Sequence, residues 1–554
     1  MERRRSAPAL LMALALTAAL VGCGGGSVGD DGAATDDTGS GADTDDGGSG
    51  TSADSGGDGD AAEEGEPVPG GEVIYGIISD STGFNVLEGL GEGAGRIVTA
   101  LSDPLVAYNA DGELVPHALE SFESNDDATV WTLTLRDGIT FHDGAPLDAE
   151  AMRANFQAFK DSPSVGFALG RVSSFEVVDE LTVEVTMTAP WAAFPHVLVG
   201  GIGSLVSPDT IGTSDDFVGI GPFVLDSWTP GDGAVAVRNE NYWRADEGLP
   251  YLDRITFKVI NDQASRRQAL EAGDIDAYYA PGDADVLDFQ AGGDIVFHQN
   301  TGETNEGLYI LNTTRPPTDD VRVRRALALA IDRELLIENF RSGLTEPASS
   351  FISPDSPWYV ATDYPGYDPE AAAALVEEYE AEVGPISFEL TASNAPEVIE
   401  VAEVVISFWS DAGIDVSLVP IQPGTEVPVV IADDFNAIAW AQFSAIDPDG
   451  EYIFFHSSGG ALNWSNLVDE RIDDGFEMAR TSFDDGERKE GYALVQEALA
   501  DQVPMLWIDH FGPVEGVASS PDVHGFLDQH TVDGEPSWGF GGGSYFRWTE
   551  IWKG

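Results

Sequence analysis

"ISFELTASNAPEVIEVAEVVISFWSDAGIDVSLVPI", residues 386–421, is the stretch that decides the fold class. Residues 386–390 and 414–421 are rich in apolar and β-branched side chains, which favour strands. Between them, apolar residues recur with a helical period over about 397–412, and Gly413 stands where such a helix would end. A strand, a helix and a second strand in succession form a βαβ unit, whose strands pair in parallel. The sequence therefore predicts an α/β fold with a partly parallel sheet.

Further elements are predicted on the N-terminal side of this unit. Residues 70–79 read as a short apolar strand that leads into a loop. Met152, Phe156 and Phe159 recur at helical spacing and predict one buried helix face. A single long helix is expected from about Asp320 to Phe340. Its predicted inward residues are Val323, Leu327, Ala330 and Ile331.

Two β-hairpins are also predicted, because alternating runs are interrupted by turn residues. Residues 130–144 alternate strictly and would turn at Asp137-Gly138 into a second short strand. Residues 175–187 alternate in the same way and would turn at Asp179-Glu180.

The start of the chain has the organisation of an export signal. Arg3-Arg4-Arg5 precede the apolar run 7–21, which is too short to cross a bilayer core of about 30 Å comfortably. Leu20-Val21-Gly22-Cys23 resembles the lipobox of bacterial and archaeal lipoproteins. The resemblance implies removal of a signal peptide at 1–22 and lipidation of Cys23, with two or three acyl chains as a stable anchor. An uncleaved anchor and a soluble secreted form are the alternatives, and both Sec and twin-arginine export stay open.

Residues 23–69 are predicted to be a flexible acidic tether behind the only cysteine of the chain. Glycine and aspartate dominate, and after Cys23 the stretch has no aromatic residue, Leu, Ile, Lys or Arg. Such a composition buries too little apolar surface to offset the entropy of ordering. We therefore expect a body held on the extracytoplasmic face of the cell membrane, periplasmic or at the cell surface.

Charge excludes some classes of partner. The chain has 97 Asp and Glu against 26 Lys and Arg, a formal net charge of −71 at pH 7. Binding of nucleic acid rests on Lys and Arg that neutralise phosphates, so nucleic acid is disfavoured as a partner. A highly soluble surface is the simplest interpretation. Adaptation to a saline habitat, where salt screens self-repulsion, is the sharper hypothesis.

Motifs of common enzymes are missing from the sequence. The body after Gly70 contains no Gly-x-Ser-x-Gly elbow, no His-Glu-x-x-His and no Walker loop. "GLGEGAG" (89–95) comes near a dinucleotide-binding pattern, but no strand is predicted to end just before it, and we interpret it as a flexible loop. The eight His are scattered, and His524 and His530 are a weak pair for a metal. We expect no catalytic activity, no cofactor and no metal site.

Several stretches between residues 103 and 508 carry motifs in a recognisable order. They are the run 103–150, the Gly-x-Gly-Pro turn and Tyr-Trp end of 218–243, the Gly-Asp-x-Asp near the end of 251–279, the Asn-Thr, Pro-Pro and Val-Arg-x-Ala-Leu series of 311–336, "NWSNLVDERID" (463–473) and "VPMLWI" (503–508). In this order they resemble the peptide/nickel-type solute-binding proteins of ABC importers, family 5 (dipeptide- and oligopeptide-binding proteins), in lipoprotein form.

The resemblance implies a periplasmic-binding-protein-like α/β fold of the large type II class, with the ligand cleft between two lobes. Lobe I would take 70–309, with an inserted subdomain at about 113–206, and lobe II would take 310–507. Residues 508–554 would return to lobe I, with crossings near Tyr309–Asn312 and Met505–Asp509. The implied role is capture of a small solute by a monomer, hinge closure and delivery to permease and ATPase subunits. A surface sensor with the same fold is the alternative role.

The resemblance also implies positions for the ligand site. They map to Phe84, Asn85, Asn305, Trp440, Gln442, Phe443 and Asp447. Trp440 is either a stacking wall of the cleft or a core aromatic, and Asp447 either a ligand contact or a loop residue that caps a helix.

One departure from the family pattern bears on the ligand. Peptide-binding members carry an Asp about three residues after the Trp, where this chain has Gln442, Phe443 and Ser444. A buried ammonium without a counter-charge is costly, which argues against free-amine peptides unless Asp447 substitutes. We rank a peptide or peptide-like solute first, an oligosaccharide second and a chelated metal third.

Overall fold

The computed structural model describes residues 65–281, 286–287, 289, 293–299, 305–422, 425–443, 446–510, 515–537, 540–541 and 545–554. The predicted signal peptide, Cys23 and the tether up to residue 64 lie outside the described residues. Residues 65–69 have no regular secondary structure, and Val68 lies against Gly554 at the C-terminus. No helix in the described part of the chain combines the length and the apolar character needed to cross a bilayer.

The first lobe is built on a sheet of seven strands within the described residues. In spatial order they are β12 (Val296–Gln299), β19 (Glu515–Ser519), β11 (Ala277–Pro281), β1 (Glu72–Ile77), β10 (Arg254–Val259), β9 (Gly233–Arg238) and β8 (Phe223–Thr229). The predicted strand at 70–79 is β1, which pairs in parallel with β10 and β11. Because β19 lies between β11 and β12, the C-terminal part of the chain completes this sheet.

The second lobe is built on a sheet of six described strands. Their order is β14 (Glu346–Pro347), β18 (Met505–His510), β13 (Asn305–Leu311), β17 (Ala437–Phe443), β15 (Ser387–Ser393) and β16 (Asp415–Ile421). β15, α8 (Pro396–Asp411) and β16 form the βαβ unit predicted for residues 386–421, with the two strands parallel. Gly413 has a φ of 92°, so it reverses the chain after α8 as predicted.

A third sheet forms the inserted subdomain, which here means β4 to β7, α2 (Ala149–Asp161) and the short helices up to Gly203. Its order is β4 (Leu119–Ser124), β5 (Val130–Leu135), β7 (Thr182–Met187) and β6 (Val172–Val177). The hairpin predicted at Asp179-Glu180 is confirmed, because β6 and β7 pair antiparallel. The hairpin predicted at Asp137-Gly138 is wrong. β5 is already paired on both edges, with β4 and β7, so the chain after it forms only a bridge from Thr140 to Pro146.

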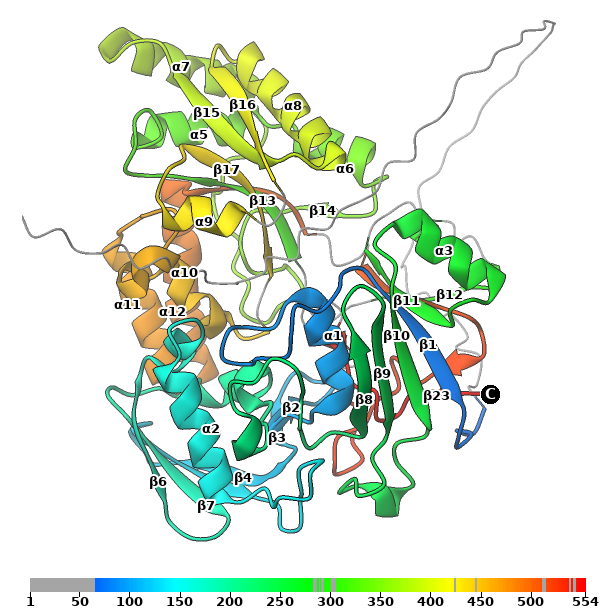
Figure 1. Cartoon of the computed structure of the whole chain (residues 1–554). Helices are drawn as coiled ribbons and strands as arrows, with labels where there is room; N and C mark the ends of the chain where they lie inside the picture. Colours follow the sequence, from blue (N-terminus) through cyan, green and yellow to red (C-terminus); the bar gives the residue numbers. More distant parts are fainter. Residues whose placement is uncertain are drawn as a thin grey trace, which may run out of the picture.

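Most helices lie beside these sheets, whereas α11 and α12 pack on each other (Figure 1). The helices are α1 (Glu92–Leu101), α2, α3 (Gln263–Ala272), α5 (Val321–Ala330), α6 (Arg333–Phe340), α7 (Pro369–Glu382), α8, α9 (Glu426–Ile431), α10 (Tyr452–Phe455), α11 (Glu470–Thr481) and α12 (Asp485–Gln502). The predicted helix face of Met152, Phe156 and Phe159 is buried in α2.

Two helix predictions need correction. The long helix expected over 320–340 is two helices, because the Asp332 carboxylate caps a new N-terminus by accepting a hydrogen bond from the Leu335 amide. Its predicted inward residues are nevertheless buried. "GLGEGAG" is only partly a loop, since α1 begins inside it. A Cβ on Gly93 would lie 2.4 Å from the carbonyl oxygen of Ser79, so this glycine allows the helix to pack close to the strand end.

The chain passes between the two large sheets twice. β12 belongs to the first sheet and β13 to the second, while β18 belongs to the second and β19 to the first. The crossings therefore lie between Gln299 and Asn305 and between His510 and Glu515. The stretches predicted as crossings, and the lobe boundaries set at 309/310 and 507/508, fall instead inside β13 and β18, where ladder pairing continues across them.

Candidate ligand cavity

A cavity of about 1080 Å³ lies where the two lobes and the inserted subdomain meet. The first lobe contributes residues of α1 and of the C-terminal segment, such as Val98 and Phe546. The inserted subdomain contributes residues within 159–204, and the second lobe residues within 446–480. A cavity of this size holds a small solute, and movement of any of the three parts changes its walls.

The wall from the second lobe carries acidic side chains that are already paired. Asp447 accepts hydrogen bonds from Arg488 Nη2 at 2.7 and 2.8 Å and from the Tyr492 hydroxyl at 3.1 Å. Asp449 accepts hydrogen bonds from Arg480 Nε at 2.6 Å and Nη2 at 3.0 Å. The short loop 446–451 and the helices α11 and α12 thus hold two arginine–carboxylate pairs, all four residues buried.

Side chains of the inserted subdomain reach across to these acids. Trp191 Nε1 donates to Asp449 Oδ2 at 2.9 Å, and His196 Nε2 lies 3.2 Å from Asp447 Oδ2. His196 Nδ1 lies 2.6 Å from the hydroxyl of Tyr108 in the first lobe. Because a carboxylate can only accept, Nε2 carries the proton and the neutral ring accepts from Tyr108. His196 therefore connects all three parts of the molecule.

The electrostatics keep these groups in fixed protonation states near neutral pH. Burial lowers the pKa of His196 despite the attraction of Asp447, so the imidazole is neutral. Burial alone would raise the pKa of Asp447, but His196 and Arg488 more than offset it and hold that pKa below its usual value. Asp447 is therefore an ionised acid whose charge is balanced inside the protein.

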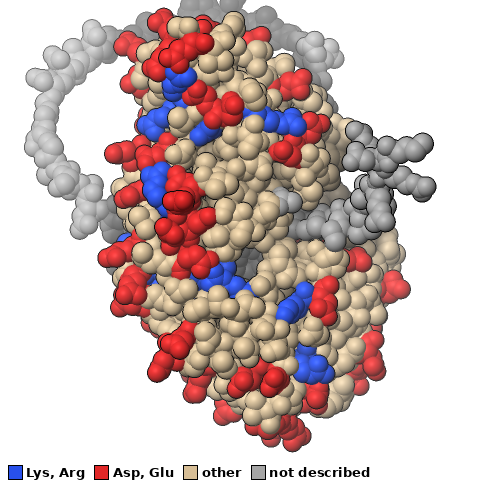
Figure 2. All heavy atoms as spheres, turned by 90° about the vertical axis from the view of Figure 1, so that its left-hand side faces the viewer, with Lys and Arg blue, Asp and Glu red and all other residues tan. Residues whose placement is uncertain are grey.

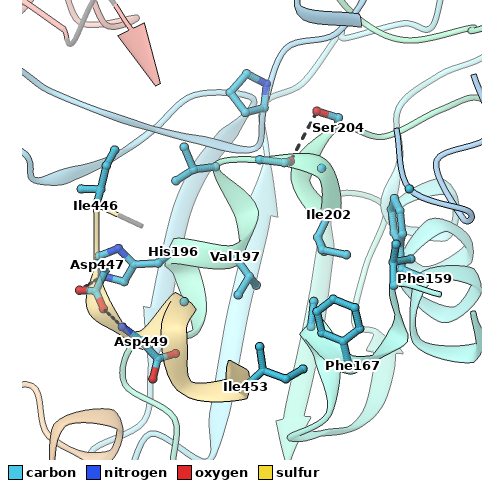
Figure 3. A pocket seen from close by; sticks show the side chains of 18 of the residues that line it. Phe159, Phe167, His196, Val197, Ile202, Ser204, Ile446, Asp447, Asp449 and Ile453 are labelled. Atoms are coloured by element: carbon cyan, nitrogen blue, oxygen red, sulfur yellow. Dashed lines mark hydrogen bonds and ion pairs between the residues drawn. The ribbon is translucent and has the colours of Figure 1, made fainter. Parts of the chain in front are cut away.

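The wall from the inserted subdomain has a different chemistry. Phe159, Phe167, Val197 and Ile202 line it, and Ile453 of the second lobe faces them. Figure 3 shows these side chains together on one side, with His196, Asp447 and Asp449 gathered on the other. The cavity thus has a charged but neutralised wall and an apolar wall.

The predicted site residues are only partly brought together. Asp447 lines the cavity, and the cap expected of it is also present, because its Oδ1 accepts from the Asp449 amide at 3.0 Å. Trp440 is a core residue, with its ring centroid 4.5 Å from that of Trp464 and outside the cavity lining. Phe84 is likewise in the core, edge-on to Trp228.

The other predicted residues lie near the crossings or in turns. Asn305 Nδ2 donates to Glu515 Oε2 at 2.6 Å, and Gln442 Nε2 donates to Glu451 Oε2 at 2.8 Å. Asn85 caps its own turn by accepting from the Leu87 amide. The side chain of Phe443 lies outside the described residues. Asn85, Asn305 and Gln442 do not line the cavity.

Sequence reasoning missed Trp191, His196 and Arg480. A usable signal for the arginine was present, since basic residues are scarce in this chain and Arg480 follows Ile472, Phe476 and Ala479 at helical spacing, on what proves to be the buried face of α11. Such a residue needs a buried acid as partner, and "DPD" at 447–449 supplies one. Trp191 and His196 lie in a loop and a single 3₁₀ turn, where no periodic pattern marks them.

Comparisons with known proteins agree with this architecture. Residues 113–463 match the model of the bacterial extracellular solute-binding proteins, family 5 (middle region). The chain belongs to this family. Among the described residues, no group of three or more His, Cys, Asp or Glu is placed to hold a metal ion.

Curated relatives match over part of their length. The nickel-binding periplasmic protein of Escherichia coli K12 is 32% identical over 290 residues, covering 50% of this chain and 55% of that protein. The glutathione-binding protein GsiB of Salmonella paratyphi A is 31% identical over 270 residues, covering 47% and 52%. The matched segment thus spans about half the length of these relatives.

Solved structures share the fold over nearly the whole body. AgaA of A. tumefaciens, bound to agropinic acid, has a TM-score of 0.75 at 22% identity and covers 87% of this chain and 99% of that one. AppA of Bacillus subtilis, bound to a nonapeptide, has a TM-score of 0.74 at 22% identity and covers 88% and 100%. The family 5 binding-protein fold, α/β with two lobes and a further subdomain, is therefore established.

Proposed function

We propose that this protein captures a peptide or peptide-like solute outside the cytoplasm and delivers it to an ABC importer by closure of its lobes. The observation that carries the proposal is the cavity of about 1080 Å³ enclosed by both lobes and the inserted subdomain. The chain passes between the two lobes twice, from β12 to β13 and from β18 to β19, and the strands that flank these passages are neighbours in each sheet, which favours a hinge. Binding in the cavity would shift the population from open to closed forms.

The lining supports a peptide-like solute over the other classes. Asp447 and Asp449 are balanced by Arg488 and Arg480, so neither is free to pair with a ligand ammonium. Asp447 does not take the place of the missing Asp after Trp440. The apolar wall offers little to the hydroxyls of a sugar, whose burial without hydrogen bonds is costly. A peptide-like solute without a free amine fits these walls best.

Attachment to the membrane is part of the proposal. Cys23 would carry acyl chains, and the acidic stretch behind it would let the body reach permease and ATPase subunits as a monomer. Figure 2 shows acidic side chains, with fewer basic ones, spread over one face of the body. Such a surface keeps a tethered protein away from anionic headgroups, and the saline-habitat hypothesis stays a prediction.

The test is native mass spectrometry of the protein purified gently from rich medium, followed by small-angle scattering with and without the retained solute. A peptide-like mass together with a smaller radius of gyration on binding supports the proposal. A retained sugar would transfer the role to an oligosaccharide. A protein that neither retains a solute nor changes its radius with peptide mixtures would contradict transport of this class.

A further inference from the structure

The apolar wall of the cavity has a property that packing alone does not explain. Phe167 lines the cavity and exposes 38% of its surface. It lies in the short 3₁₀ helix Gly166–Leu169 that follows α2, and its ring faces the same space as Val197 and Ile202 (Figure 3). Apolar surface left exposed in a cavity gains free energy when an apolar group of a ligand covers it.

Glycines keep the space in front of this wall open. A Cβ added to Gly200 or to Gly201 would meet no atom within 4 Å, and both residues line the cavity. Neither has a positive φ, so the backbone does not require glycine at these positions. At Gly201, which lies in a 3₁₀ helix next to Ile202, a larger side chain would extend into open space.

The buried acids of the cavity are kept away from this space. Asp447 and Asp449 lie on the opposite side, each already held by an arginine and by a subdomain side chain. Ile453, on the second lobe, faces the apolar wall and completes it. Closure of the subdomain on the second lobe therefore encloses an apolar compartment from two sides.

We propose that the compartment walled by Phe159, Phe167, Val197, Ile202 and Ile453 is an apolar subsite that binds a bulky aliphatic or aromatic group of the captured solute. This inference rests on the proposed function, because it assigns the part of the solute that the cavity selects. A small or wholly polar solute leaves Phe167 uncovered and binds more weakly. Burial of one such group favours binding by roughly 10- to 100-fold.

The test uses the neutral apolar fluorophore N-phenyl-1-naphthylamine and the full chain carrying Cys23→Ser, which prevents acylation. We expect saturable binding at one site, weakened at least tenfold by Gly201→Leu, which fills the compartment, and by Phe167→Ser, which removes the ring. Gly366→Leu is the matched control, because Gly366 is exposed, meets no atom within 4 Å of an added Cβ and lies outside the cavity. It should bind the dye like the parent.

Circular dichroism establishes that each variant is folded, and the two cavity variants act independently, so failure of one to fold leaves the other. Absence of saturable binding, or equal affinity in parent and cavity variants, overturns the inference. These outcomes differ from failure of the proposed function, which the retained-solute experiment measures without the dye. A protein that retains a peptide but ignores the dye would keep its function and lose the apolar subsite.

Discussion

The two walls of the cavity use their side chains in opposite ways. The second lobe presents Asp447 and Asp449, which are matched by arginines within the same lobe and by His196 and Trp191 across the cavity. The part of the inserted subdomain that faces Ile453 presents an apolar surface, with Phe167 only partly covered. Paired charges fix the geometry of a wall, whereas uncovered apolar surface is what a ligand can still gain from. Charge in the lining is therefore a poor guide to the charge of the solute.

The largest effect is expected from breaking a buried pair of the charged wall. Asp449→Ala leaves the Arg480 guanidinium buried without its partner and removes the acceptor of Trp191 Nε1. Loss of one member of a buried pair costs about 3–5 kcal/mol in the free energy of unfolding. Urea unfolding at neutral pH measures it.

The matched control is an exposed pair. Glu150→Ala removes the partner of Arg153 on α2, where the two side chains are 66% and 40% exposed. We expect a loss below about 1 kcal/mol. Equal losses for the two substitutions would mean that the pair behind the charged wall is no more structural than a surface pair.

The second largest effect is a pH dependence of stability that arises from Glu515, at the start of β19. Its carboxylate accepts from the Tyr279 hydroxyl at 2.8 Å and from Asn305 Nδ2 at 2.6 Å. Burial raises the pKa of Glu515 to about 7, although these donors and Arg96 oppose the shift. Below the unfolded-state pKa of 4.5 both states are protonated, and the stabilising contribution is complete. As the pH rises through about 7 the contribution is lost, by up to roughly 3 kcal/mol.

Glu515→Gln should therefore flatten the fall in stability between about pH 5 and pH 8, measured by urea unfolding at both values. Glu120→Gln, at an exposed position on β4, is the control and should leave the pH dependence of the parent unchanged. A parent whose stability does not fall over this interval would contradict the assignment.

The fold could be predicted from the sequence, but only part of the candidate ligand site could be. Residues 386–421 carry the periodicities of a strand, a helix and a strand, which depend on neighbours along the chain, and β15, α8 and β16 follow them. The cavity depends on pairs far apart in sequence, such as Trp191 with Asp449 and His196 with Asp447. The sequence leaves Trp440 open between a cleft wall and a core aromatic, because the strand pattern is the same whether the ring faces a cleft or packs on Trp464, as it does here.

A smaller effect, on the balance of open and closed forms, is expected from His196, which connects the subdomain to the second lobe. His196→Ala removes the connection from Tyr108 through the imidazole to Asp447, while Asp447 keeps Arg488. Loss of this hydrogen bond should shift the balance toward open forms by about 1–1.5 kcal/mol. Distances between spin labels on the subdomain and the second lobe report the population.

The control for His196 is His530, which is exposed and contacts Glu550. His530→Ala should leave the spin-label distances unchanged. An identical distribution in His196→Ala and the parent would show that this histidine packs the wall without holding it closed.

The smallest effect on lobe closure is expected from the ion pair of Arg171 and Glu477, which joins the subdomain to the second lobe. The Glu477 side chain is 41% exposed, so solvent and salt weaken the pair to below about 1 kcal/mol. Glu477→Gln should open the lobes slightly at low salt and not at all in molar salt, measured by the same labels. The effect of His196→Ala should persist at both salt concentrations, because its hydrogen bond is shielded inside the cavity wall. If both effects vanished together in salt, closure would rest on the acidic surface as a whole, and the distinction between the charged wall and the apolar wall would not govern the motion.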